Sequence, residues 1–463
     1  MPAEATAVPA PAAPDEPSPS LRYAWYVVGV LTLAYVFSFI DRQIFSLLVT
    51  PLRHDLQISD TQISLLQGLS FALFYTFFGI PIGRLADIHS RRRIIALGLL
   101  AWSLLTTACG LAHTFWQMLF LRMGVGVGEA ALSPAAYSLI TDYFPRRRLA
   151  IAISVYSMGI YLGSGLSYAV GGLVVGWAST QAAWTLPLVG TVRSWQLIFL
   201  ALGLPGVAMA PLLYTVREPA ARLATARKRP AVPLRQVFSY IGRNGRTFVL
   251  HNMGFGLLAL SGYAGAAWIP EFFHRSFQWS IRSAGVAFGL NVGIFGSLGI
   301  IGAGWMADRL RARGRANANL FVGAVAAMLL IPVGCAVFLS PSPRWSLALL
   351  APLVLLQSAP FGVAPAAIQE MMPAEMRGQA SALYLFVINL IGLGIGPTAV
   401  AACTQYLFRR DTALNYSLAL VTAAACGLGG MLLYGALKPF LASLERQRAW
   451  ALSQATAASG EAD

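Results

Sequence analysis

The sequence predicts an all-α membrane protein with twelve transmembrane helices in two related six-helix bundles. Three observations lead to this fold class: the composition, a series of long apolar runs, and a repeat that relates the two halves of the chain. Of the 463 residues, 57% are hydrophobic and 11% are charged, whereas soluble domains carry about 25% charged residues. We therefore expect most of the chain to lie in a lipid bilayer.

Twelve apolar runs are long enough to cross roughly 30 Å of hydrocarbon as helices. Six precede a long basic stretch and six follow it. The runs cover residues 26–48, 63–82, 94–111, 115–140, 150–177, 195–214, 248–273, 284–306, 320–339, 345–368, 380–406 and 413–437.

The basic residues indicate membrane topology. A net charge of +15 could suggest a nucleic-acid partner, but Arg and Lys gather at the termini and in the loops after even-numbered spans. Residues 91–93, 146–148 and 217–246 hold most of them. The positive-inside rule then places both termini in the cytoplasm. Because this placement accounts for the positive charge, we expect no nucleic acid. Of the 33 basic residues only Lys228 and Lys438 are Lys, which fits a GC-rich bacterial genome, so we expect a bacterial inner membrane.

The domain organisation follows from these spans and from two repeated signatures. GRLADIHSRRR after the second span resembles GWMADRLRARGR after the eighth, which aligns Asp87 with Asp308. The start of the fifth span resembles the start of the eleventh and aligns Gly163 with Gly392. Such duplication is common in transporters. The predicted segments are a disordered cytoplasmic tail (1–22), a first bundle (23–216), a basic cytoplasmic linker (217–246), a second bundle (247–438) and a cytoplasmic tail (439–463).

Four charged residues lie in the interior of two predicted spans, namely Asp41 and Arg42 in the first and Arg122 and Glu129 in the fourth. A charge at the bilayer centre costs several kcal/mol unless it has a partner or faces a wet cavity, so function is the default explanation. Arg122 and Glu129 are seven residues apart, which is about two helical turns and places them on one face. Three glycines between them would let a neighbouring helix approach closely. The alternative is an ion-pair network that only fixes helix packing.

The loop after the second span carries Gly83, Asp87, Arg91 and Arg92 at the spacing G-x-x-x-D-x-x-x-R-R. At these residues the chain resembles the major facilitator superfamily. The resemblance implies the major facilitator fold and alternating access. Asp87 and its repeat partner Asp308 would then form, with the arginines, a latch between the bundles on the cytoplasmic side when the cavity faces outward.

The pairing of IDR in the first span with RMGVGVGEA in the fourth resembles the Spinster group of lysolipid and sphingosine-1-phosphate transporters. This resemblance implies a lipid-like substrate. Arg42 would bind its anionic headgroup, with Arg122 and Glu129 as further substrate contacts. Asp41 and Glu129 would be the proton-coupling acids, and Arg122 would hold one acid ionised until a proton or the substrate displaces it. Tyr168 in the fifth span is expected to line the site.

Three alternatives stay open at this stage. The cargo could be another small organic anion or a drug, transport could be facilitative instead of proton-coupled, and the chain could be a receptor or a scramblase. An enzyme is not expected, because the segments between spans hold neither a phosphate-binding glycine loop nor a nucleophile elbow. The four cysteines lie in apolar spans, so we expect packing roles, no metal and no cofactor. Nothing in the sequence requires more than a monomer among membrane lipids.

Overall fold

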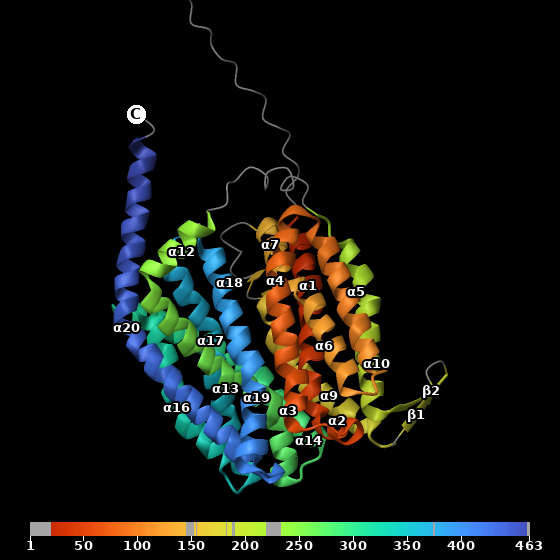
Figure 1. Ribbon diagram of the computed structural model, residues 1–463. Helices are drawn as coiled ribbons and strands as arrows, with labels where there is room; N and C mark the ends of the chain where they lie inside the picture. Colours follow the sequence, from red (N-terminus) through yellow and green to blue (C-terminus); the bar gives the residue numbers. More distant parts are fainter. Residues whose placement is uncertain are drawn as a thin grey trace, which may run out of the picture.

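The structure is a computed structural model that describes residues 20–144, 152–153, 155–181, 183–187, 190–218, 233–373 and 376–460. Residues 1–19 of the predicted N-terminal tail and residues 219–232 of the predicted linker lie outside the described part. Figure 1 shows the helices gathered in two groups that lie side by side.

The first group holds the helices before residue 216. Short 3₁₀ or π-helical turns join several of them, as at Phe45–Leu47 and Leu65–Leu69. The helices are α1 (Leu21–Ile44), α2 (Val49–Leu56), α3 (Asp60–Ser64), α4 (Ser70–Ile88), α5 (Arg91–Cys109), α6 (Phe115–Glu129), α7 (Leu132–Tyr143), α9 (Gly159–Ala178) and α10 (Ser194–Met209).

The second group follows the linker. Its π-helical turns include Val292–Gly296 and Asn389–Ile395. The helices are α12 (Leu234–Arg243), α13 (Gly245–Phe277), α14 (Ile281–Asn291), α15 (Ser297–Ala312), α16 (Ala318–Phe338), α17 (Pro343–Met371), α18 (Arg377–Ile388), α19 (Gly396–Ala402) and α20 (Leu414–Gly460).

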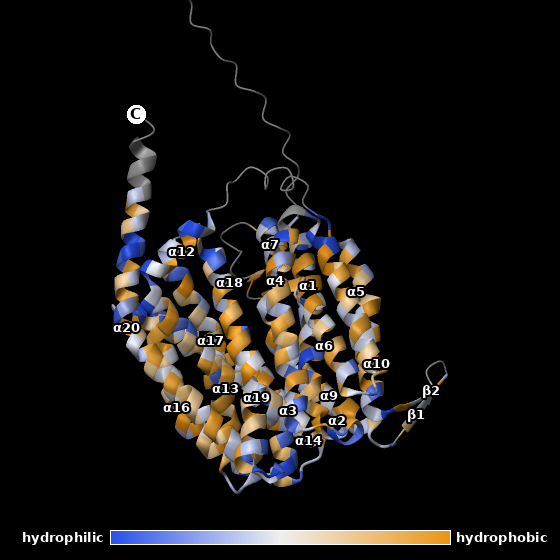
Figure 2. Ribbon diagram, in the orientation of Figure 1, coloured by the Kyte–Doolittle hydropathy of each residue, from blue (hydrophilic) through white to orange (hydrophobic). Residues whose placement is uncertain are grey.

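Eleven helical segments of the described chain are long and apolar enough to cross a membrane. The fourth predicted span is not one continuous helix, since α6 ends at Glu129 and α7 starts at Leu132. Together the two cover the predicted run 115–140, which is consistent with twelve spans. Figure 2 shows hydrophobic residues along the middle of both bundles and hydrophilic residues toward the ends of the helices, so the chain is a multi-pass membrane protein.

Two features were not anticipated from the sequence. The strands β1 (Ala183–Leu186) and β2 (Gly190–Arg193) form an antiparallel hairpin between α9 and α10. The helix of the last span does not end near residue 437, because α20 runs on to Gly460. Lys438 ends the apolar run and Pro439 follows it, but Pro439 lies inside α20, so neither the polar residues nor the proline ends the helix there.

The two ends of the bundles differ in how tightly the halves are joined. We call the end where α1 starts and α20 finishes the terminal side, and the other end, with α2, α3 and the hairpin, the opposite side (Figure 1). On the opposite side one continuous apolar core includes Phe45 and Trp195 from the first bundle and Trp268 and Phe272 from the second. On the terminal side the cores are largely separate: the core of the first bundle takes in one buried residue of the second, Leu393, and the core of the second bundle consists of residues of that bundle.

Glycines allow the close helix contacts that the sequence predicted around the fourth span. A Cβ added at Gly126 would lie 2.8 Å from the carbonyl oxygen of Phe71, and one at Gly128 would lie 2.9 Å from the backbone nitrogen of Trp102. At Gly124 an added Cβ would meet only the tip of the Leu105 side chain, at 2.9 Å. The predicted approach of α4 and α5 to α6 is confirmed.

These contacts predict different costs for two neighbouring substitutions. Gly126→Ala should destabilise the protein by about 1–3 kcal/mol, because a backbone carbonyl cannot move aside. Gly124→Ala should cost much less, because the Leu105 side chain can change rotamer. Thermal unfolding of both variants in detergent measures the difference, and equal midpoints would contradict the assigned helix contact.

Candidate functional site

Glu129, the last residue of α6, is held by two side chains of α1. Arg42 Nε donates to Glu129 Oε2 at 2.6 Å, and Ser38 Oγ donates to the same oxygen at 2.5 Å. Ser38 lies one helical turn before Arg42, so both side chains reach the same face of α1. Glu129 is only 1% exposed, and its charge therefore depends on Arg42 for compensation.

Asp41 and Arg122 form a second pair between the same two helices. Arg122 Nη1 lies 3.6 Å from Asp41 Oδ2, and Thr106 Oγ1 of α5 donates to that oxygen at 2.9 Å. Neighbouring residues of a helix point about 100° apart, which lets Asp41 and Arg42 contact different residues of α6. The structure thus brings the four charged residues from the interior of the predicted spans together as two ion pairs.

This group of charges has more donors and acceptors than its present contacts use. No described residue accepts a hydrogen bond from Nε, Nη1 or Nη2 of the fully buried Arg122. Asp41 Oδ1 and Glu129 Oε1 also have no donor among the described residues. The Arg122 guanidinium instead packs on the ring of Phe45, 4.9 Å from its centre. An unsatisfied buried polar atom costs free energy. These unused donors and acceptors could bond to one another if the same four residues paired differently.

A small cavity of about 30 Å³ lies between the bundles beside Arg42. Arg42 is the charged residue of its lining, and its guanidinium lies 4.6 Å from the ring centres of both Phe71 and Tyr75, a cation–π arrangement. Gln67 is also polar, and both atoms of its amide lack a partner among the described residues. The lining comprises Phe39, Arg42, Gln43, Ser46, Gln67, Phe71, Tyr263, Ala266, Ala267, Leu393 and Pro397.

The other predicted site residues lie behind this lining. Asp41, Arg122 and Glu129 are buried and are not among the lining residues. Tyr168 is also buried, and its hydroxyl lies 2.7 Å from Gln43 Oε1 and 2.8 Å from the carbonyl oxygen of Ala266. Tyr168 therefore connects a lining residue of the first bundle to α13 of the second. Gln67 was missed from the sequence, although an amide within an apolar span was a usable signal.

The predicted latch residues of the first bundle contact that same bundle. Arg91 Nη1 donates to Asp142 Oδ2 at 2.5 Å and Arg91 Nε donates to Glu218 Oε1 at 2.8 Å. The backbone N–H of Arg92 donates to Glu218 Oε2 at 3.0 Å. Burial alone would raise the pKa of Glu218, but these hydrogen bonds outweigh burial and lower the pKa below its ordinary value. Gly83 lies opposite Pro134 of α7.

The second half repeats this arrangement in part. Asp308 is exposed and accepts a hydrogen bond from Arg311 Nη1 at 3.2 Å, and Arg311 also pairs with Glu370 of α17. Asn319 Nδ2 of α16 donates to Glu370 at 3.0 Å. The side chain of Asp87 lies outside the described residues. In this conformation the described contacts of the latch residues do not cross between the bundles. The latch across the bundles was predicted for the outward-facing conformation, so this prediction stays open.

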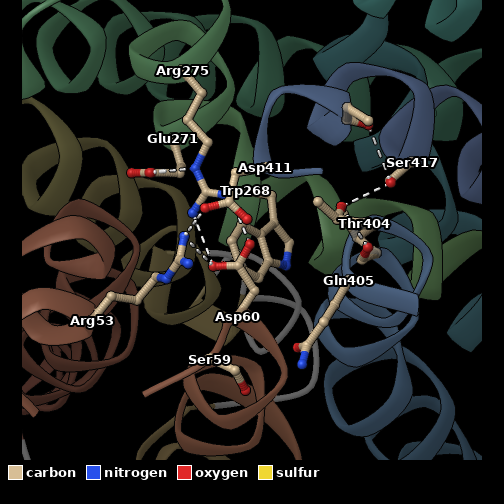
Figure 3. Close-up of polar contacts among 12 residues, drawn as sticks. Arg53, Ser59, Asp60, Trp268, Glu271, Arg275, Thr404, Gln405, Asp411 and Ser417 are labelled. Carbon is tan, nitrogen blue, oxygen red and sulfur yellow. Dashed lines mark hydrogen bonds and ion pairs between the residues drawn. The ribbon is translucent and has the colours of Figure 1, made fainter. Parts of the chain in front are cut away.

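On the opposite side a network of charged residues joins the two bundles, as Figure 3 shows. Arg275 of α13 donates to both oxygens of Asp60, at 2.7 and 2.9 Å, and its Nε donates to Glu271 at 2.7 Å. Arg53 of α2 lies 3.1 Å from Asp60 and donates to Asp411 at 2.9 Å. Asp60, which starts α3 and is 3% exposed, thus holds one arginine from each bundle.

Further polar contacts surround this network. Thr50 donates to Glu271 at 2.9 Å, Thr61 donates to Gln405 at 2.8 Å, and Ser64 donates to Thr398 at 3.3 Å. Arg53 and Arg275 lie in loops between the predicted spans, and the network was not predicted from the sequence. A usable signal was that two acids at the span ends, Asp60 and Glu271, equal these arginines in number and are opposite in charge.

The described residues offer no metal centre, since no group of three or more His, Cys, Asp or Glu side chains is arranged to hold an ion. Cys109 and Cys426 are buried in apolar surroundings, and Cys335 and Cys403 are partly buried. None of the four is in a disulfide.

The two central ion pairs predict that the stability costs of single substitutions do not add in the double variant. Removing one charge, in Glu129→Gln or Arg42→Gln, should cost about 3–5 kcal/mol, because the remaining buried charge loses its partner. The double variant should cost less than the sum, by about 0.5–3 kcal/mol. Unfolding in detergent measures the cycle, and exposed Glu445→Gln is the control that should change stability by less than about 0.5 kcal/mol. Strictly additive costs would contradict the pairing.

Comparison with known proteins places this geometry in a family. The Major Facilitator Superfamily model matches residues 31–397. The chain is 29% identical over 430 residues to an MFS-type efflux pump of Mycolicibacterium smegmatis, with 92% of this chain and 94% of that protein covered. It is 30% identical over 263 residues to protein spinster homolog 1 of Xenopus tropicalis, with 56% of this chain and 47% of that protein covered.

A solved structure is similar over nearly the whole chain. The crystal structure of a bacterial homologue of the human lysosomal transporter Spinster, inward-facing and unoccupied, has a TM-score of 0.77 and 26% sequence identity. The match covers 92% of this chain and 99% of that one. It confirms the resemblance to the Spinster group, and together with the family model it shows that this chain belongs to the major facilitator superfamily and is a transporter, not an enzyme.

Proposed function

We propose that the chain is a secondary transporter of an amphiphilic lipid with an anionic headgroup, such as a lysophospholipid or sphingosine-1-phosphate, and that it works by alternating access. One observation carries the proposal. Arg42 is the charged residue of the central cavity lining, and it is bound to Glu129, an acid that a proton can neutralise. The charge of a bound substrate and the protonation of Glu129 would therefore both act on the Arg42 side chain.

Arg42 has the chemistry to bind a phosphate headgroup. Its Nε donates to Glu129, while its two terminal nitrogens have no acceptor among the described residues and remain available for a bidentate contact. Apolar residues such as Phe39, Phe71 and Leu393 would contact the hydrocarbon tail. Arg122, Glu129 and Tyr168, which lie behind the lining, would take part in substrate binding by holding Arg42 and Gln43.

The cavity volume of about 30 Å³ has room for water but not for a lipid. Substrate binding therefore requires the bundles to move apart. The largely separate cores on the terminal side allow such a movement, whereas the shared core and the Asp60 network oppose it on the opposite side. We infer that the Asp60 network is the gate of the opposite side.

The positive-inside rule supports assigning the terminal side to the cytoplasm of a bacterial inner membrane. On that assignment both termini are cytoplasmic and the gate is closed toward the outside. Gly83, Asp87, Arg91, Arg92 and Asp308 would then close the cytoplasmic side in the outward-facing state. The transporter would act as a monomer among membrane lipids.

Proton coupling would use Asp41 and Glu129. Protonation of Glu129 removes the charge that holds Arg42, which would free the guanidinium for an anionic substrate. Arg122 would keep Asp41 ionised in one state and could approach Glu129 in the other, because its nitrogens have no fixed acceptor. The coupling would then consist of an exchange of partners within the two ion pairs.

A second candidate is an efflux transporter for a drug or another small organic anion. One relative that covers 92% of this chain is an efflux pump, and Arg42 would bind any anion of suitable size. The fold and the central charges are the same for both candidates, so the cargo has to be measured. Facilitative transport, a receptor and a scramblase differ from both in their response to an imposed gradient.

Flux into liposomes tests the proposed function. We expect saturable uptake of a labelled lysophospholipid or sphingosine-1-phosphate that a proton gradient increases. Glu129→Gln and Asp41→Asn should remove the gradient dependence, and Arg42→Ala should weaken binding about tenfold or more, since a charged hydrogen bond is lost. Arg313→Ala, at an exposed position remote from the cavity, is the control.

Each alternative has its own result in this assay. Gradient-independent flux in the wild type would indicate facilitated transport, and fast non-saturable lipid exchange would indicate a scramblase. Uptake of organic anions without lipid flux would support the second candidate. Unchanged binding in Arg42→Ala would exclude the headgroup contact.

The gate can be tested separately through the accessibility of position 64, which is buried between the bundles beside Thr398. In a background without the native cysteines, Ser64→Cys should react slowly with an impermeant maleimide added from outside. Asp60→Asn should raise the rate about fivefold or more, because two arginines lose their shared acid and the open state gains population. Asp411→Asn, whose side chain is 63% exposed, should change the rate little. Equal rates in both variants would contradict the gate.

A further inference from the structure

A basic pocket lies on the terminal side of the second bundle, away from the central cavity. It has a volume of about 450 Å³ and is lined by residues of α12, α13, α20 and the turn between α12 and α13. Four of the lining residues are cationic and none is acidic: Arg243, Arg246, Lys438 and Arg446. None of these cations has an ion pair among the described residues, so the positive charge of the pocket is uncompensated.

The walls of the pocket are held rigidly. Thr247 Oγ1 of α13 and Ser443 Oγ of α20 are 2.8 Å apart and buried. The extension of α20 beyond the last span packs on α12, where the rings of Trp450 and Tyr240 meet edge to face with centres 5.8 Å apart. Figure 1 shows α20 running past α12 on this side. The contacts hold together the three helices that carry the four exposed basic side chains around one space.

A buried polar side chain faces the same pocket. Asn244 is 2% exposed and lines the pocket. Its Nδ2 donates to the carbonyl oxygen of Tyr240 at 3.0 Å, whereas its Oδ1 has no donor among the described residues. Buried polar atoms rarely stay unpaired, so Oδ1 calls for a donor on a ligand, such as a hydroxyl group.

Exposed apolar side chains lie directly beneath the basic ones. Val249 follows Arg246 by three residues on α13, and Tyr434 precedes Lys438 by four residues on α20. Spacings of three and four place side chains on the same helix face, one turn deeper in the membrane. Both are exposed, Tyr434 by 71% and Val249 by 60%. An acyl chain would find an apolar surface next to the basic pocket.

We propose that this pocket binds the headgroup of an anionic phospholipid from the leaflet on the terminal side, with phosphatidylglycerol as the fitting chemistry. The phosphodiester would contact the four basic residues, a glycerol hydroxyl would donate to Asn244 Oδ1, and the acyl chains would lie along Val249 and Tyr434. Basic pockets between transmembrane helices bind anionic lipid headgroups in this way, and the volume suits a ligand of this size.

The experiment uses the full chain purified in an uncharged detergent. Binding of phosphatidylglycerol is measured by native mass spectrometry and by the shift of the thermal midpoint, in parallel with phosphatidylcholine and with soluble glycerol phosphate. We expect saturable binding of phosphatidylglycerol, much weaker binding of phosphatidylcholine, and no displacement by glycerol phosphate. Displacement by glycerol phosphate, or equal affinity for the two lipids, would overturn the lipid site.

Charge-neutralising variants assign the binding to this pocket. Arg246→Gln with Lys438→Gln and Arg446→Gln should lower the affinity for phosphatidylglycerol at least tenfold, since each basic residue near an anionic headgroup contributes several-fold. The control, Arg235→Gln with Arg313→Gln and Arg448→Gln, removes the same charge from exposed positions outside the lining. Equal losses in the two triple variants would overturn the proposal, because a general surface potential would explain both.

Single variants keep the test independent of folding. If the site triple variant is not monodisperse, Arg246→Gln alone should still weaken binding severalfold, and Arg246→Lys should restore it. An unchanged affinity in Arg246→Gln would overturn the proposal. The result does not depend on lipid transport, because it is read from binding at a pocket on the outer surface of the second bundle.

Discussion

The cost of burying charge constrains the centre of this protein more than any other interaction. Asp41, Arg42, Arg122 and Glu129 lie in apolar helices and are buried or nearly so, and a single unpaired charge there would cost several kcal/mol. The cost is offset because each acid of one helix meets an arginine of the other. The positions of α1 and α6 relative to each other therefore depend on the ionisation of two carboxylates.

A second group of charged residues, around Asp60, lies partly in buried and partly in exposed surroundings. Asp60 and Arg275 come from different bundles and are largely buried, while Asp411 at the rim is exposed. Pairs of this kind hold the two bundles in one arrangement, and water can solvate the charged groups once the bundles part. The apolar core shared between the bundles lies just beneath. Charge and core together favour closure of the opposite side. On the terminal side no ion pair between described residues joins the bundles, and the core of the first bundle takes in only one buried residue of the second, Leu393.

Most of the fold was predictable from the sequence, because hydrocarbon thickness fixes the length of apolar runs and desolvation makes each buried charge conspicuous. Asp41, Arg42, Arg122 and Glu129 could be found in this way, but not their pairing, which depends on the rotation of α1 against α6. The Asp60 network was missed because its members lie at span ends, where a single charge costs little free energy and only the equal number of acids and arginines pointed to pairing. The break after Glu129 was also missed, although Pro134 is a signal for it, because a proline has no N–H to donate to the carbonyl oxygen of Ala130, four residues before it.

Three consecutive residues of α1 connect these parts. Asp41 contacts Arg122 of α6 and Thr106 of α5, Arg42 contacts Glu129 and the cavity, and Gln43 lines the cavity beside the Tyr168 hydroxyl. Tyr168 in turn reaches the carbonyl oxygen of Ala266 in the other bundle. Because successive side chains of a helix point in different directions, a small rotation of α1 would alter the acid pairs, the cavity and the bundle contact together. Under the proposed function, this helix would be the element through which proton, substrate and conformation affect one another.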